Sequence, residues 1–308
     1  MRIALRPIAA FIVIAFGLAW LAALPLWLGG GIESPLLPIV AIVMMATPAI
    51  AAILVVLLIE RPASRAVALG LRPLGPARRF IGFLALAIVI PIAIIVAALL
   101  VGSLFGVYHA DLVDYSGFRA LIDQQLAAAG AGADELPMPI GMLVAVQCVA
   151  VLAGAVINTI PALGEELGWR GWLLPRLMPL GAVPAIVISG VIWGAWHAPL
   201  ILLGYNYPTA PGWLGVVMMM GMCTLVGAVF GWLRLRSGSV WPAALAHGSF
   251  NSAAGLSLVF AAATPAIDTT QATVLGWTGW LVPLALVIVL VATGQFRPRT
   301  QVTTTIEA

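Results

Sequence analysis

The sequence predicts an all-α protein, a polytopic transmembrane helical bundle of about eight spans with both termini in the cytoplasm. Of its 308 residues, 63% are hydrophobic and 8% are charged, and the mean hydropathy is +1.13. Several apolar segments reach 18 residues or more, the length at which a helix can cross a bilayer. One helical bundle is therefore favoured over the two soluble domains that the length alone would suggest.

Apolar segments bounded by Pro, Gly and Arg define the expected helices. The first follows MRIALRP, as the apolar part of a signal peptide would, but it runs for about 21 residues without a small-residue cleavage site. We therefore expect it to be retained as a membrane span. The expected spans are 8–28, 36–59, 80–104, 143–165, 184–204, 213–233, 241–262 and 274–294.

The arginines orient this bundle. All 14 basic residues are Arg, and a cytoplasmic N-terminus leaves only Arg119 on the outer side, as the positive-inside rule requires. The same distribution supports an even number of spans. The expected location is the bacterial inner membrane, as a multi-pass protein. No basic run is interleaved with aromatic residues, so the expected partner is the lipid bilayer and not nucleic acid. The cytoplasmic set is Arg2, Arg6, Arg61, Arg65, Arg72, Arg78, Arg79, Arg170, Arg176, Arg234, Arg236, Arg297 and Arg299.

Three regions are expected along the chain. Residues 1–139 contain three spans, the basic cytoplasmic loop 60–79 and most of a long extracytoplasmic loop. Residues 140–262 form a helical core that carries the polar motifs, and 263–308 hold the last span and a cytoplasmic tail. The basic loop either only connects two helices or also binds anionic lipid head groups. In the outer loop, FRALIDQQLAAAG has apolar residues at helical spacing and predicts a short surface helix.

The stretch GEELGWRGW places three ionisable residues beside an apolar run, which in a membrane protein points to function. The alternative is an interfacial ion pair that ends a helix. Glu166 and Arg170 are spaced i, i+4 with the acid first, the favourable order for such a pair. Glu165 is rotated by about 100°, so we expect it to face the bundle interior without a partner, as a general base would. Its expected depth is one or two turns from the cytoplasmic face.

Two later spans contribute further polar groups. His247 and Asn251 are also spaced i, i+4, so an imidazole and a carboxamide share one helix face and can donate hydrogen bonds to an oxyanion. His197 supplies a second imidazole. The alternatives are a His197 that bonds a nearby carbonyl and an Asn251 that holds two helices together. Along straight helices, His247 would lie about 9 Å and His197 about 18 Å from the cytoplasmic face.

Other conspicuous residues have simpler interpretations. Cys148 and Cys223 lie inside apolar runs with no ligand spacing, so we expect small core residues. Gly227 and Gly231 form a small-xxx-small pair, which favours close helix packing.

Taken together, three motifs resemble those of the CPBP family of intramembrane proteases. Residues 165–170 fit EExxxR, Trp193 to His197 resembles FxxxH, and His247 to Asn251 fits HxxxN. This family includes type II CAAX prenyl endopeptidases and bacteriocin-processing and self-immunity proteins. The resemblance covers about residues 140–262. Trp193 replaces the usual Phe, an aromatic exchange expected to affect the shape of the pocket more than its chemistry.

The resemblance implies an enzyme, an intramembrane endopeptidase that acts on a membrane-associated peptide or protein in a cavity open toward the cytoplasm. Glu165 would activate water with help from His197, and His247 and Asn251 would stabilise the oxyanion. The Glu166–Arg170 pair would position the catalytic helix.

The metal requirement stays open at this point. Glu165, His197 and His247 could bind Zn²⁺ and leave one position for water, or the enzyme could be a metal-free, glutamate-dependent hydrolase. The sequence has no HExxH motif, which would have favoured a metal. Two other classes also stay open: a proton- or ion-coupled transporter using the same polar groups, and a non-catalytic immunity or scaffold protein. The sequence specifies neither the substrate nor the oligomeric state.

Overall fold

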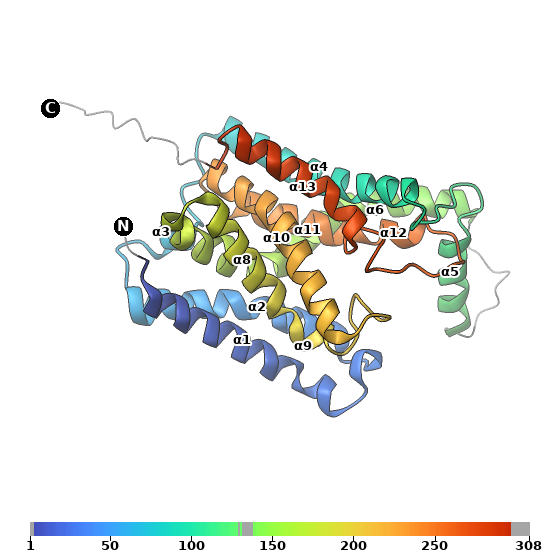
Figure 1. Cartoon of the computed structure of the whole chain (residues 1–308), viewed down its shortest axis with the longest axis horizontal. Helices are drawn as coiled ribbons and strands as arrows, with labels where there is room; N and C mark the ends of the chain where they lie inside the picture. Colours follow the sequence, from blue (N-terminus) through green and yellow to red (C-terminus); the bar gives the residue numbers. More distant parts are fainter. Residues whose placement is uncertain (1–2, 129, 131–137, 297–308) are drawn as a thin grey trace.

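A computed structural model describes residues 3–128, 130 and 138–296, and in this part of the chain all regular elements are helical (Figure 1). An isolated bridge pairs Ala110 with Ala261, and no strand forms within these ranges. The all-α prediction is therefore confirmed. The expected cytoplasmic tail and Arg2, Arg297 and Arg299 lie outside the described residues.

A helix lies at each of the eight expected spans. Five helical segments in the described part, those beginning at Leu5, Leu37, Ala77, Ile140 and Gly212, are long and apolar enough to cross a membrane. The helices at the other three places are shorter, with 15, 14 and 16 residues. The eight are α1 (Leu5–Leu28), α2 (Leu37–Val55), α4 (Ala77–Leu104), α6 (Ile140–Glu166), α8 (Ala182–Trp196), α10 (Gly212–Ser237), α11 (Trp241–Ala254) and α13 (Trp277–Ala292).

Short elements extend or connect these helices. The π-helical segment η2 (Val56–Glu60) continues α2, and α9 (Ala198–Ile201) and α12 (Leu256–Val259) follow α8 and α11 closely. The predicted surface helix of the outer loop is α5 (Ser116–Ala128), which buries none of its residues. The remaining short elements are η1 (Gly31–Glu33) and, in the basic loop, α3 (Arg65–Ala68).

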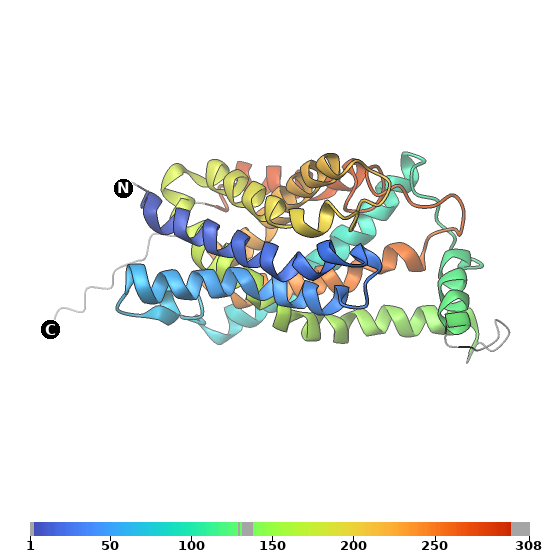
Figure 2. The same ribbon diagram turned by 90° about the horizontal axis from the view of Figure 1, so that it is seen from below.

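The two ends of the bundle differ in charge. The start of α1, α3 and the end of α13 lie at one end, and α5 lies across the other (Figures 1 and 2). The first end carries the loops and helix termini with most of the arginines, so the positive-inside rule assigns it to the cytoplasm. The opposite end carries Arg119 and most of the acidic side chains of the described residues, which are Glu33, Asp111, Asp114, Asp123 and Asp268.

The fourth span does not end at residue 165, as the sequence predicted. After α6 the helix continues through π-helical η3 (Leu167–Leu173), α7 (Leu174–Leu177) and η4 (Met178–Leu180), a helical path of 41 residues from Ile140. The path continues because Trp169 and Trp172 are fully buried in the core instead of marking an interface. Glu165 therefore lies roughly 22 Å from the cytoplasmic end of this path, at 1.5 Å per residue, and not within two turns of it.

Glycines allow the central helices to approach closely. On α6 and η3, Gly164 and Gly168 face α2, and a β-carbon at Gly168 would lie 2.5 Å from Pro48 Cβ. Small residues at helix contacts are the usual means of close packing in membranes, because backbones can then touch. Similar glycines join α8 to α10 and α6 to α11; they are Gly190, Gly194, Gly154 and Gly248.

Large apolar side chains cover the outside of the bundle. On α6 alone Val149, Leu152, Val156, Ile157 and Ile160 are exposed. A surface of this kind is stable against lipid chains and unstable in water. Together with the five long apolar helices, it identifies a multi-pass membrane protein.

Candidate active site

The four residues predicted to be catalytic line one cavity. Glu165, His197, His247 and Asn251, from α6, the end of α8 and α11, surround a space of about 370 Å³ that α2 and α10 also border. The fold thus brings together motifs that are more than 80 residues apart in the chain. Their catalytic roles stay a prediction, but their shared location is a property of the structure.

Glu165 is buried, with 2% of its surface exposed, and faces the cavity. It is not without a partner, as the sequence had suggested, because the Trp193 indole Nε1–H donates a hydrogen bond of 2.7 Å to Glu165 Oε2. A phenylalanine at position 193 could not make this contact. The aromatic exchange therefore adds a polar contact to Glu165, and its effect on the shape and chemistry of the pocket stays a prediction.

Glu166 faces away from Glu165 and holds two groups at once. Its Oε1 accepts a hydrogen bond of 2.7 Å from Arg170 Nη1 and contacts His247 Nδ1 at 2.9 Å. The predicted ion pair with Arg170 is thus confirmed, but it is buried and not interfacial, since Glu166 is 0% and Arg170 1% exposed. No pattern in the sequence indicated that Glu166 would also contact His247.

Arg170 fills a space left by a glycine. Its guanidinium carbon lies 4.0 Å from the centre of a Trp193 ring, and a β-carbon at Gly227 would lie 2.4 Å from Nη2. Gly227 was predicted to allow close helix packing. Its missing side chain instead leaves the space that the Arg170 guanidinium occupies. Stacking on an aromatic face suits a buried guanidinium, whose charge Glu166 balances.

The tautomer of each imidazole follows from its partner. His197 Nδ1 lies 2.9 Å from the Trp193 carbonyl oxygen, which can only accept, so Nδ1 carries the proton. The alternative role considered for His197, a bond to a nearby carbonyl, is thus observed. His247 Nδ1 likewise donates to the Glu166 carboxylate. In both rings Nε2 is left for a ligand or substrate in the cavity.

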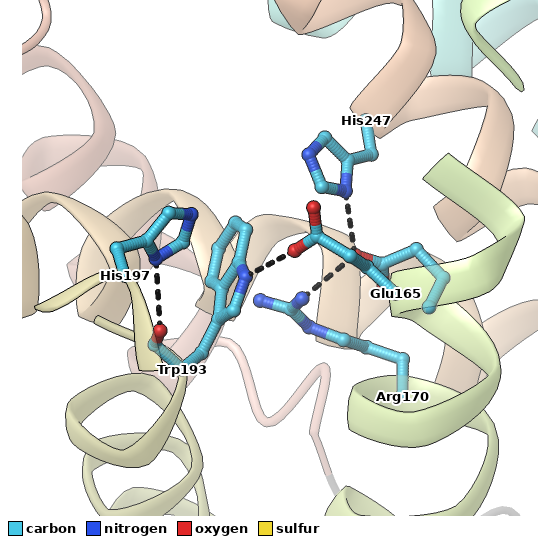
Figure 3. Close-up of polar contacts among 6 residues, drawn as sticks. Glu165, Arg170, Trp193, His197 and His247 are labelled. Carbon is cyan, nitrogen blue, oxygen red and sulfur yellow. Dashed lines mark hydrogen bonds and ion pairs between the residues drawn. The ribbon is translucent and has the colours of Figure 1, made fainter. Parts of the chain in front are cut away.

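Trp193 lies between the two imidazoles. Its ring centroid is 5.8 Å from that of His197 and 5.3 Å from that of His247, so the imidazole centroids are at most the sum, about 11 Å, apart. In Figure 3 the second carboxylate oxygen of Glu165 points toward the His247 ring, and both unbonded ring nitrogens lie on that same side. His197 and His247 therefore line the same cavity, although straight helices would have placed them at different depths.

Two asparagines also line the cavity. Asn251 is exposed on the α11 face that carries His247. Asn158, about two turns before Glu165 on α6, was missed by the sequence reasoning; its Nδ2 donates to the Gly154 carbonyl at 2.9 Å. A carboxamide within an apolar run was the available signal, because polar side chains in membrane helices usually face a cavity or a partner.

A shared metal was predicted at Glu165, His197 and His247. In the described part of the chain, no three His, Cys, Asp or Glu side chains are grouped as ligands of one ion. The two imidazoles and the Glu165 carboxylate do not adopt the spacing of a three-ligand centre here. The binding of Zn²⁺ therefore stays a prediction, which direct metal analysis of the protein would test.

Comparison with known proteins gives a family match for the segment that carries the motifs. Residues 145–253, which contain all three motifs, match the family described as type II CAAX prenyl endopeptidase Rce1-like. A 78-residue segment is 28% identical to CAAX prenyl protease 2 of Methanococcus maripaludis, covering 24% of this chain and 28% of that protein. The chain thus matches less than a third of that relative's length.

The fold and the cavity define a multi-pass helical membrane protein in which Glu165, His197, His247 and Asn251 line one cavity. Its residues 145–253 match the Rce1-like family, which agrees with the resemblance inferred from the motifs. The three-region division of the chain, with boundaries at 139 and 262, stays a prediction.

Proposed function

We propose that this protein is an intramembrane endopeptidase that hydrolyses peptide bonds of membrane-associated proteins or peptides. One observation carries the proposal: a buried carboxylate, that of Glu165, faces a cavity together with two imidazoles and a carboxamide. Buried ionisable groups in membrane helices are costly and mark functional sites. The match of this segment to a family of membrane endopeptidases supports the reaction type.

In the proposed reaction, Glu165 is the general base. Its carboxylate takes a proton from water as the water oxygen forms a bond to the substrate carbonyl carbon. The C–N bond then breaks, and the proton held by Glu165 passes to the leaving nitrogen. His197 assists through Nε2, since its Nδ1 is committed to the Trp193 carbonyl. The products are a carboxylic acid and an amine.

The developing oxyanion needs donors on the other side of the carbonyl. Asn251 Nδ2 is one such donor, and His247 is the other when its ring is protonated, since Nδ1–H already points at Glu166. The Glu166 carboxylate balances the positive charge on that ring, and Arg170 holds the carboxylate in place. Glu166 and Arg170 are thus positioning residues.

No step of this mechanism runs through a metal ion. Zn²⁺ bound by Glu165, His197 and His247 would supply a Lewis acid and an activated water. Elemental analysis of the purified protein tests this: one equivalent of Zn²⁺ that is lost in His197→Ala would support a metal centre.

The experiment that tests the function compares membrane proteomes of the bacterial host carrying wild-type protein or Glu165→Ala. The proposal expects new C-termini within membrane-associated segments only with the wild type. Equal sets of termini in both strains would contradict it. A transport activity that depends on Glu165, or partner binding that survives loss of both Glu165 and His247, would instead favour a transporter or a non-catalytic immunity or scaffold protein.

A further inference from the structure

The cavity has a closed end and an open end. At the closed end, Glu165, Trp193 and His247 are 2%, 2% and 4% exposed. Two of them contact the buried ion pair between Glu166 and Arg170: His247 bonds Glu166, and the Trp193 ring stacks against Arg170.

Between this level and the cytoplasmic end, the bundle is filled by bulky side chains. Trp169, Trp172, Leu173 and Phe230 are all 0% exposed, and Arg170 is 1% exposed. Trp172 stacks on Phe11 of α1, with ring centroids 4.8 Å apart, so the first helix also packs against these bulky side chains. None of these residues lines the cavity.

In the opposite direction the cavity continues to the loops of the acidic end. Its lining includes Tyr205 and Asn206, from the loop between α9 and α10, and Leu275, just before α13. These three are partly exposed, and Asn251, one helical turn beyond His247, is exposed. The positive-inside rule assigns both loops to the extracytoplasmic side, the reverse of the opening that the family resemblance implied.

We propose that the cavity admits its substrate from the extracytoplasmic side of the membrane, and that this substrate is an apolar peptide segment in the outer half of the bilayer. This inference rests on the proposed function. It assigns the direction of access, which the order of buried and exposed lining residues supports independently of the reaction type.

The lining selects for apolar side chains without fixing their shape. Met44, Met45, Met219 and Met222 contribute to the wall, and methionine adapts to differently shaped apolar partners. Apart from Glu165 and the two histidines, no acidic or basic side chain of the described chain lines the cavity. A charged segment would therefore lose its hydration there without compensation.

Thiol labelling from one side of the membrane tests the direction. The background is full-length Cys148→Ser, because Cys223 is buried as expected, whereas Cys148 is exposed and the expectation of a core residue is wrong for it. Tyr205→Cys and, independently, Leu275→Cys place a thiol at the open end, and Arg65→Cys places one on exposed α3. Intact spheroplasts and permeabilised membranes are treated with a bulky, membrane-impermeant sulfonated maleimide, and cleavage of a membrane-anchored substrate is then followed.

The proposal expects Tyr205→Cys and Leu275→Cys to react in intact spheroplasts and Arg65→Cys to react only after permeabilisation. Labelling at the open end should lower cleavage about tenfold or more relative to the same unlabelled variant, because the adduct blocks the approach to Glu165. Labelled Arg65→Cys should keep its rate.

Two outcomes would overturn it: open-end thiols that react only after permeabilisation, or open-end labelling that leaves cleavage unchanged at both positions. Glu165→Gln is measured in parallel. If Glu165→Gln abolishes cleavage while labelling has no effect, the direction is wrong and the proposed function stands. If Glu165→Gln cleaves normally, the proposed function itself fails.

Discussion

Glu165 and Glu166 are adjacent in the chain, yet they contact different helices. Glu165 accepts from Trp193 of α8, and Glu166 binds Arg170 of its own helix and His247 of α11. Helical geometry was enough to predict that the two carboxylates diverge. Their partners on other helices could not be predicted, because they depend on how far each helix is rotated about its own axis.

Trp193→Phe tests whether the indole positions the general base. The ring is retained, but the N–H that donates to Glu165 Oε2 is lost. A hydrogen bond to a charged group contributes about 1.5–3 kcal/mol, so kcat should fall about 10- to 100-fold. KM should change little, because the aromatic wall is kept. Steady-state kinetics on reconstituted protein give both values.

Trp232→Phe is the matched control for that substitution. Trp232 lies on α10 outside the cavity, and its indole nitrogen has no hydrogen-bond partner within the described residues. Its replacement should leave kcat unchanged. Equal kcat values for Trp193→Phe and wild type would show that the indole has no role beyond filling space.

Glu166→Gln tests the buried ion pair. The substitution leaves the Arg170 guanidinium buried without its counter-charge, and breaking such a pair costs about 3–5 kcal/mol. Reversible unfolding in mixed micelles should show this loss. Activity should fall as well, because His247 loses the anion that orients its ring.

The control uses a second carboxylate–arginine pair, Glu60 with Arg176, whose side chains are 20% and 23% exposed. Because water screens this pair, Glu60→Gln should cost about 1 kcal/mol or less. A Glu166→Gln protein as stable as Glu60→Gln would contradict the buried pair's structural role.

At the scale of helices, the lengths of the apolar segments predicted where each helix lies. The charged residues, however, led to a wrong prediction of where the fourth span ends. The sequence suggested that the fourth span ends at Glu165, because acids and an arginine normally mark an interface. Instead the helix continues to Leu180, since the charges pair internally and the tryptophans beside them are buried. A neutralised pair cannot be distinguished from an interfacial one in sequence alone.

Gly168→Ala tests the contact that joins η3 to α2. A β-carbon there would lie 2.5 Å from Pro48 Cβ and 2.7 Å from the Pro48 carbonyl oxygen, both parts of a rigid residue. One helix must shift, so a loss of about 1–3 kcal/mol is expected in the same unfolding assay. Gly82→Ala on α4 is the control, since its β-carbon meets nothing within 4 Å. Equal stabilities for the two variants would contradict the close packing.

For the whole molecule, composition and arginine positions predicted a helical membrane bundle with most of its arginines at one end, and the structure has both features. The motifs predicted which residues share a site, and those residues line one cavity. The direction of the cavity was not predictable. It depends on side chains such as Trp169 and Tyr205, which close one end and line the other without belonging to any motif.

The central claim is that Glu165 activates the water that cleaves a peptide bond. It is tested by the cleavage rate of Glu165→Gln, purified and reconstituted in liposomes with a membrane-anchored apolar substrate. A positioned general base contributes about 10²- to 10⁴-fold, so the rate should fall by at least about 100-fold. Exposed Glu33 provides the control, since Glu33→Gln should cleave at the wild-type rate. A Glu165→Gln protein that matches Glu33→Gln in rate would contradict the account.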